Sequence, residues 1–214
     1  NISVNYKPLS ETAGQIQQSF EIDGARPFED VSYFSYKRAV IAENKGRRDL
    51  SGNDMQPDDK YVTDWSYNPI SDPLGYRAGS LTFELSAGSH TLKLTNISGE
   101  PAIKEIKISS EQEVLSYSKY IADLSERTAA ADGFEIEAED YFSKSDVSIK
   151  LQNDRTSAAV TPQSSSKIKL NTIGGSNYKQ VGQYITWQFN VENAGLYNIA
   201  FNFKKNITSG IYSS

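Results

Sequence analysis

The sequence predicts an all-β fold, a β-sandwich assembled from two half-sandwiches that one α-helix joins. In residues 184–191 and again in 197–203, apolar residues occupy every second position, which is the period of a strand with one buried face. The turn between them ends in Gly195, which is free to adopt positive φ. Trp187 alternates in phase with its apolar neighbours, so we expect it in the core.

The first residues of the chain repeat the last part of this stretch. Residues 1–6 read NISVNY and residues 198–203 read NIAFNF, and their polar and apolar faces match at every step except Ser3 and Ala200. Two amphipathic strands can share such a pattern by chance. The sharper interpretation is a repeating module, with the chain starting inside one copy and stopping inside the next.

Composition excludes several classes of function. The 214 residues carry a formal net charge of -5, so nucleic acid is not expected as a partner. There is no cysteine and a single histidine, His90, which excludes thiol catalysis and multi-histidine metal sites. No run approaches the roughly 18 apolar residues of a membrane span, so we expect no direct membrane insertion. Thirteen Tyr, nine Phe and two Trp are typical of an all-β surface protein.

Alternating apolar residues predict the strands of a first β segment. The predicted strands cover residues 1–6, 15–22, 26–36, 74–85, 90–95 and 102–108. Asp23-Gly24 ends the second strand with a hairpin-type turn signal. Between residues 37 and 72 the periodicity fades, and a long functional or partly mobile loop is expected there.

One helix is predicted to connect this segment to a second one. Ser110 with Glu113 forms a capping box, and Gly133 is a natural C-terminal stop, so the helix is expected over residues 110–131. Its apolar stripe consists of Val114, Tyr117, Ile121 and Leu124.

The second β segment follows the helix. Its predicted strands are residues 134–141, 147–151 and 167–172 and the hairpin of 184–203, with a loop over 154–166.

Five short motifs carry a resemblance to a known family. They are IEAE at 136–139, VENAGLY at 191–197, NDRTS at 153–157, IDGARPF at 22–28 and GSHTLKL at 88–94. Together they resemble carbohydrate-binding-module-like β-sandwiches, and their order is similar to the N-terminal modules of large bacterial extracellular solute-binding lipoproteins of sugar ABC transporters. The resemblance implies a jelly-roll, galactose-binding-like β-sandwich.

The motif order also implies a domain organisation. Residues 134–214 would form the N-terminal half of a module and residues 1–108 the C-terminal half, with 109–133 as a helical connector. We expect the halves to pair, either as one permuted sandwich or by swapping between chains, because isolated halves leave apolar faces and sheet edges open. The connector is long enough to favour closure within one chain.

Several residues are candidates for binding a glycan. Trp65, Tyr67, Tyr76 and Tyr178 could stack on sugar rings, and Arg155 could hydrogen-bond to sugar hydroxyls. Packing in the core is the alternative for each aromatic residue, and solvation of the surface is the alternative for the arginine.

A calcium site follows only from the resemblance. Glu135, Glu137 and Glu139 share one face of a predicted strand, and a solvated face is the simpler interpretation. In the modules that this chain resembles, the matching glutamates hold a structural calcium, so Glu137 and Glu139 are the implied ligands. Those modules often add an aspartate in their final strand, whereas residues 103–105 read IKE. No other cofactor is expected.

Two further charged clusters have simple interpretations. Asp54, Asp58 and Asp59 could supply oxygen ligands, but their spacing matches no EF-hand, which favours a flexible acidic loop. Arg47 and Arg48 could bind hydroxyls or carboxylates, although exposed arginines usually solvate a surface.

The sequence therefore predicts a non-catalytic carbohydrate-binding-like module at the bacterial cell surface, an accessory domain of a sugar-transport solute-binding protein. Its expected partner is a glycan or oligosaccharide, with a transporter or another surface protein as a further partner. The alternative is a structural or protein-docking module without a small ligand. A glycan hydrolase is disfavoured, because no opposed pair of carboxylates can be nominated.

Overall fold

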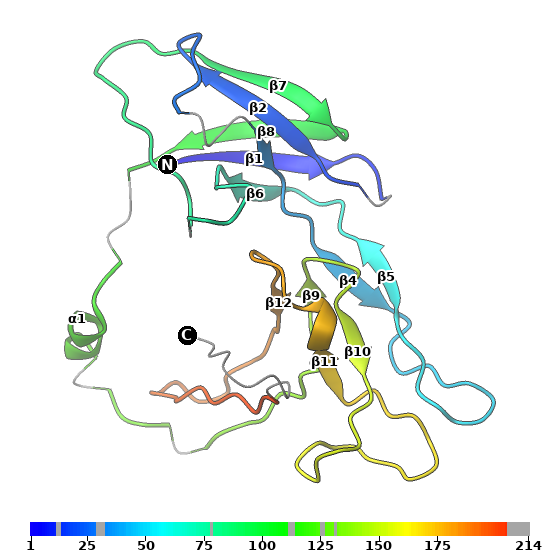
Figure 1. Cartoon of the computed structure of the whole chain (residues 1–214). Helices are drawn as coiled ribbons and strands as arrows, with labels where there is room; N and C mark the ends of the chain where they lie inside the picture. The colour runs from blue at the N-terminus through cyan, green and yellow to red at the C-terminus, as the bar shows by residue number, and fades with distance from the viewer. Residues whose placement is uncertain are drawn as a thin grey trace. The chain divides into compact units, whose positions relative to one another are not determined.

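Figure 1 shows a computed structural model, which describes residues 1–11, 14–28, 33–77, 79–110, 114–124, 127–130 and 132–204. In these ranges the fold consists of antiparallel strands in four small sheets, one six-residue α-helix and one 3-10 turn. The chain forms two compact units. The first comprises Asn1–Glu113 and Ile136–Phe189, and the second comprises Val114–Glu135 and Asn190–Ser214.

The first sheet places the N-terminal strand in its centre. It contains β6 (Ser66–Pro69), β1 (Ile2–Pro8) and β8 (Pro101–Ile108), in that order. Strand β1 therefore forms antiparallel hydrogen-bonded ladders on both of its edges. Ile2, Val4 and Tyr6 point into the core, where none of them is more than 2% exposed.

The second sheet supplies the other layer of this core. It contains β3 (Phe34–Ser35), β2 (Gln17–Ile22) and β7 (Leu92–Ser98), in that order. Phe20 from β2 and Phe34 from β3 lie in the same buried cluster as the inward face of β1. The rings of Tyr6 and Tyr36 are 4.2 Å apart between centroids. The predicted all-β, sandwich-like class is confirmed (Figure 1).

The third sheet combines strands from both β segments of the sequence. Its order is β12 (Ile185–Thr186), β9 (Ser143–Lys144), β4 (Val40–Glu43) and β5 (Asp58–Tyr61). Strands β4 and β9 meet where Val40 pairs with Lys144. A separate two-stranded sheet of β10 (Lys150–Gln152) and β11 (Thr172–Gly174) leads into the 3-10 turn η1 (Gly175–Asn177).

A buried ion pair fixes this third sheet. The side chain of Lys144 is only 2% exposed, and its Nζ lies 2.7 Å from Oδ1 of Asp59. The same Nζ donates to the carbonyl of Ile149 at 2.6 Å, and Lys150 bonds to the second oxygen of Asp59. Burial lowers the pKa of Lys144, and the neighbouring Asp59 opposes that shift. One carboxylate thus ties together β5, β9 and β10.

The second unit has little buried surface. Its helix α1 (Tyr117–Ala122) is capped by Ser116, whose hydroxyl accepts the backbone N–H of Lys119, and none of its residues is buried. The chain segments of this unit meet at a bridge between Ala129 and Leu196. No helix in the described parts of the chain is long and apolar enough to cross a membrane.

The predicted helix over residues 110–131 is wrong in length and in its N-cap. The helix begins after Ser116 rather than Ser110, and Glu113, the other half of the expected capping box, lies outside the described residues. Val114 and Tyr117 of the apolar stripe are exposed. Short helices depend on the packing of an apolar face for their stability. Because no residue of this helix is buried, the helix extends over only six residues.

Four strand predictions in the first β segment are confirmed, namely those of β1, β2, β7 and β8. The predicted turn at Asp23-Gly24 is also confirmed: both residues have positive φ, and Ile22 and Ala25 exchange two backbone hydrogen bonds across it. Of the stretch 26–36, residues 34 and 35 form β3 and residues 29–32 lie outside the described part.

Other strand predictions are wrong. The described residues of 74–85 form only an isolated bridge at Ser80, and residues 134–141 form no strand. Of the hairpin predicted over 184–203, only Ile185–Thr186 is a strand. Conversely, the stretch 37–72 contains β4, β5 and β6 instead of one long loop. Those strands are short and partly exposed, so their sequences show little alternation of apolar and polar residues. Tertiary contacts, such as the Asp59–Lys144 ion pair, contribute to their pairing instead. Trp187 is half-buried rather than in the core, and its indole N–H donates to the carbonyl of Ala138 at 3.1 Å.

Replacing Asp59 by Asn should lower the free energy of unfolding by about 3 kcal/mol, because it leaves the buried ammonium of Lys144 without a counter-charge. Its sequence neighbour provides a matched control. Asp58 pairs with Arg47 at the solvent-exposed surface, so Asp58→Asn should lower the free energy of unfolding far less than Asp59→Asn does. Urea unfolding of the two variants measures the difference, and equal losses would contradict a central role for Asp59.

Candidate functional site

A cavity of about 290 Å³ lies beside β6 in the first unit. Its lining includes four aromatic side chains and several polar ones. They are Tyr6, Lys37, Asp64, Trp65, Tyr67, Asn68 and Tyr184. Ligand cavities typically have volumes of about 300–1,000 Å³, so this one is at the small end and suits one ring of a larger ligand.

Trp65 and Tyr67 form the aromatic wall of the cavity. They are two residues apart, which places their side chains on the same side of an extended chain. Trp65 is 42% exposed and Tyr67 52% exposed, so both rings offer apolar surface to solvent. Large rings that remain this open are available for stacking, which a buried core aromatic is not.

Charged groups lie beside both residues, and the one at Tyr67 bonds to the side chain itself. The hydroxyl of Tyr67 donates to Oε2 of Glu105 at 2.9 Å, and that bond raises the pKa of Tyr67. The ammonium of Lys104 lies 6.0 Å from the centroid of the Trp65 ring, and the carboxylate of Asp64 accepts the backbone N–H of Trp65 at 2.7 Å. The aromatic wall is therefore preorganised.

Two further tyrosines complete the cavity, of which Tyr6 is buried and Tyr184 half-buried. Tyr6 donates its hydroxyl to the carbonyl of Lys37 at 2.6 Å, and burial raises its pKa to about 12. Burial also raises the pKa of Tyr184. The Asn68 side chain accepts the backbone N–H of Lys37 at 2.9 Å. Both tyrosines thus stay neutral at physiological pH and provide hydroxyl groups rather than charges.

The sequence-predicted ligand residues are not all together. Trp65 and Tyr67 line this cavity, while Tyr76, Tyr178 and Arg155 are not among its lining residues. Tyr76 is exposed, and Tyr178 lies against the backbone of Gly174. Arg155 donates to the carbonyl of Lys167 at 2.7 Å. The structure therefore brings two of the five candidates together in one cavity.

Sequence reasoning missed Tyr184, Asp64, Asn68 and Lys37 as cavity residues. Tyr184 comes from the second β segment and reaches the cavity only because β12 and β9 join the sheet of β4. No local pattern marks it, since its position beside Trp65 is a product of the tertiary fold.

The acidic residues near position 55 are used in ion pairs. Asp54 pairs with Arg48 at 3.0 Å and with Lys169 at 3.2 Å, and Asp58 pairs with Arg47 at 2.6 Å. Hydrogen bonds from Asn44 and Arg47 lower the pKa of Asp58. The predicted flexible acidic loop is therefore wrong, because its carboxylates are anchored by cations on several elements.

The glutamates implied as calcium ligands form an incomplete donor set. Burial raises the pKa of Glu139, with Glu137 and Asp140 adding to the shift, and Oε2 of Glu139 is buried without a hydrogen-bond partner among the described residues. Calcium takes about six to eight oxygens, of which two carboxylates supply at most about four. The described residues contain no group of three or more His, Cys, Asp or Glu that could hold a metal. Calcium binding at Glu137 and Glu139 thus stays a prediction.

Thermal unfolding with and without calcium tests this metal site. An ion held by Glu137 and Glu139 would raise the Tm of the wild-type chain by mass action, and Glu139→Gln would abolish the increase. Glu192→Gln, at an exposed glutamate outside the pair, is the control and should leave the increase intact. The same Tm with calcium and with a chelator would exclude the site.

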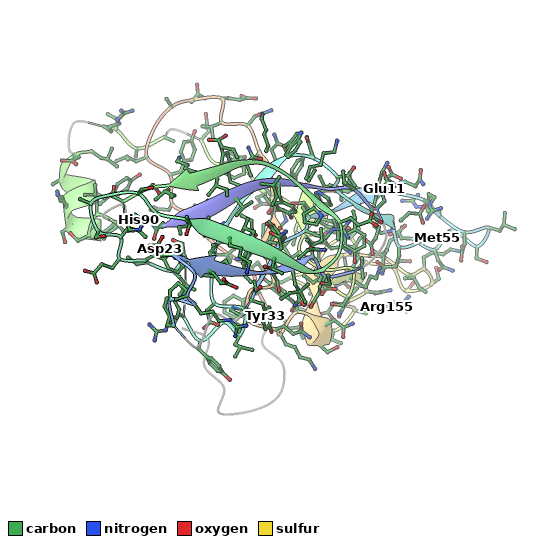
Figure 2. The ribbon with its side chains drawn as sticks, turned by 90° about the horizontal axis from the view of Figure 1, so that it is seen from above. Glu11, Asp23, Tyr33, Met55, His90 and Arg155 are labelled. Carbon is green, nitrogen blue, oxygen red and sulfur yellow. The ribbon has the colours of Figure 1, made fainter. Side chains whose placement is uncertain are left out.

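The single histidine lies in a hydrogen-bonded cluster with Asp23 (Figure 2). Nδ1 of His90 is 2.6 Å from Oδ2 of Asp23, and Nε2 is 2.8 Å from the carbonyl oxygen of Ser86. Both partners only accept hydrogen bonds, so the ring satisfies them best when both nitrogens carry protons. These contacts raise the pKa of His90, and the bonds from Thr91 and His90 lower the pKa of Asp23.

This cluster predicts a measurable titration. Because His90 is the only histidine, its ring protons give one resolved titration in NMR spectra, with a midpoint above the usual value of about 6.5. Asp23→Asn should move that midpoint downward. The histidine contributes stability below pH 6.5, and that contribution is lost as the pH rises through the folded-state pKa. A midpoint at or below 6.5 in the wild type would contradict the Asp23–His90 contact.

Comparison with known proteins gives no match: no family model, no curated protein and no solved structure matches this chain.

Proposed function

We propose that this chain is a non-catalytic carbohydrate-binding module, with a glycan or oligosaccharide bound at the cavity of Trp65 and Tyr67. The motif resemblance supports a jelly-roll, galactose-binding-like sandwich in an accessory domain of a sugar-transport solute-binding protein. In that setting the module works outside the cell, at the bacterial surface, beside transporter or other surface proteins.

The arrangement of Trp65 and Tyr67 carries this proposal. Two open aromatic rings, one steadied by a hydrogen bond to Glu105, form the wall of a cavity that also presents a carboxylate and an ammonium group. A sugar ring has an apolar C–H face and polar hydroxyls at its rim. Aromatic surface with a few convergent polar groups is the combination that binds such a ligand.

The cavity favours binding over hydrolysis. Glycoside hydrolysis requires a pair of carboxylates on either side of the scissile bond. Among the described residues that line the cavity, Asp64 is the only carboxylate. A bound glycan would therefore meet the carboxylate of Asp64, while the nearby carboxylate of Glu105 is bonded to the Tyr67 hydroxyl, which supports a role without chemistry.

Affinity electrophoresis in gels containing soluble polysaccharides tests the proposal. Retardation of the wild-type chain should be lost in Trp65→Ala, with affinity reduced at least about tenfold, roughly 1.4 kcal/mol. Tyr76→Ala is the matched control, because Tyr76 is an exposed aromatic outside the cavity, and it should be retarded like the wild type. Equal effects of the two substitutions, or no retardation by any glycan on an array, would overturn the proposal.

A protein-docking module is the second candidate, and exposed apolar residues favour it. On β8, Ile103, Ile106 and Ile108 are all exposed, and the second unit exposes Ile199, Phe201 and Phe203. Exposed apolar surface on this scale commonly marks contact with another protein.

A further inference from the structure

Two segments with the same pattern lie in opposite environments. In residues 1–6 the apolar face, Ile2, Val4 and Tyr6, is no more than 2% exposed. In residues 198–203 the matching face is open, with Ile199, Phe201 and Phe203 exposed by 75–78%. The same sequence pattern is thus buried in residues 1–6 and exposed in residues 198–203.

The difference lies in the partners of each segment. Residues Ser3–Tyr6 pair with β6 and Ile2–Pro8 pair with β8, so both edges of β1 are hydrogen-bonded. Residues 198–203 form no strand ladder with any described residue of the chain. We call the position between β6 and β8 the β6–β8 slot. One chain has one such slot and two segments whose sequence pattern fits it.

We propose that the β6–β8 slot exchanges its strand between copies of this chain, so that residues 198–203 of one copy enter the slot of a second copy in place of β1. This inference goes beyond glycan binding and does not depend on it. The occupant is defined by the repeat itself, since the slot already accepts a strand with the order Asn, Ile, small residue, apolar, Asn, aromatic.

Strand addition suits this exchange. Backbone hydrogen bonds to β6 and β8 do not depend on side-chain identity, and the alternate side chains select the strand. Ile199 is identical to Ile2, and Asn202 to Asn5. Phe203 takes the place of Tyr6 and loses the hydroxyl bond to Lys37, while Phe201 brings more apolar surface than Val4. The exchange would bury Ile199, Phe201 and Phe203 and release Ile2, Val4 and Tyr6, so the gain in apolar burial is the difference between the two sets, chiefly Phe201 for Val4.

The register of β1 predicts which residues would be opposed in the exchanged strand. Ser3 pairs with Lys107 and Asn5 pairs with Glu105. Since Ala200 takes the place of Ser3, it should lie directly opposite Lys107 of the second copy. Glu105 would then be two residues further along β8, a diagonal distance of about 7–8 Å that a disulfide does not span.

Cysteine cross-linking tests the exchange, because the 214 residues of this chain include no cysteine. A donor with Ala200→Cys is mixed with a size-tagged acceptor carrying either Lys107→Cys or Glu105→Cys, and covalent heterodimers are counted on non-reducing gels. We expect the Lys107→Cys acceptor to be cross-linked at least tenfold faster than the Glu105→Cys acceptor. Equal rates, or no heterodimer with either acceptor, would overturn the proposal.

A second pair of variants distinguishes specific strand exchange from nonspecific hydrophobic association. Phe201→Asp in the donor should reduce cross-linking at least tenfold, whereas Val114→Asp, at another exposed apolar residue of the second unit, should leave it unchanged. Both residues are exposed in the single chain, so both variants should fold. Placing Ala200→Cys and Lys107→Cys in one chain is the remaining check: a cross-linked product that stays monomeric would assign the donor strand to its own chain and overturn exchange between copies.

Discussion

The double pairing of β1 is the constraint on which the sandwich depends. With ladders to β6 and β8 on its two edges, β1 sends Ile2, Val4 and Tyr6 into the core, where they meet Phe20 and Phe34 of the opposite layer. A central strand buries one whole face and leaves no edge of its own open to solvent. Removing it would expose both neighbouring strands and divide the core, so the two layers hold together only while this position is filled.

A second constraint joins the two β segments of the first unit. The carboxylate of Asp59 neutralises Lys144 in a buried place, and β9 then extends the sheet of β4 and β5. Buried pairs of this kind contribute little net stability, but they tolerate few alternative arrangements. The consequence is functional as well as structural, because β12 follows the same sheet and brings Tyr184 to the cavity where Trp65 and Tyr67 lie.

The candidate site and the exposed segment of residues 198–203 differ in how far their groups are already paired. The cavity is preorganised, since Tyr67 is bonded to Glu105 and the buried Tyr6 hydroxyl is satisfied by Lys37. Preorganisation reduces the entropy that a bound ligand must otherwise lose. Residues 198–203 instead have apolar side chains and free backbone edges without a described ladder, which is the condition in which strands are added from another chain.

The sequence by itself determined the all-β class, the strands at 1–6, 15–22, 90–95 and 102–108 and the Asp23-Gly24 turn, because alternation and turn chemistry are local properties. It also singled out Trp65 and Tyr67. Only the tertiary structure decided that Tyr184 joins them, that the predicted helix stops after six residues, and which of the two repeated strands is buried. An alternating pattern predicts that one face of a strand is buried, but it does not identify the partner that buries it. For β1 that partner comes from distant parts of the chain, the strands β6 and β8.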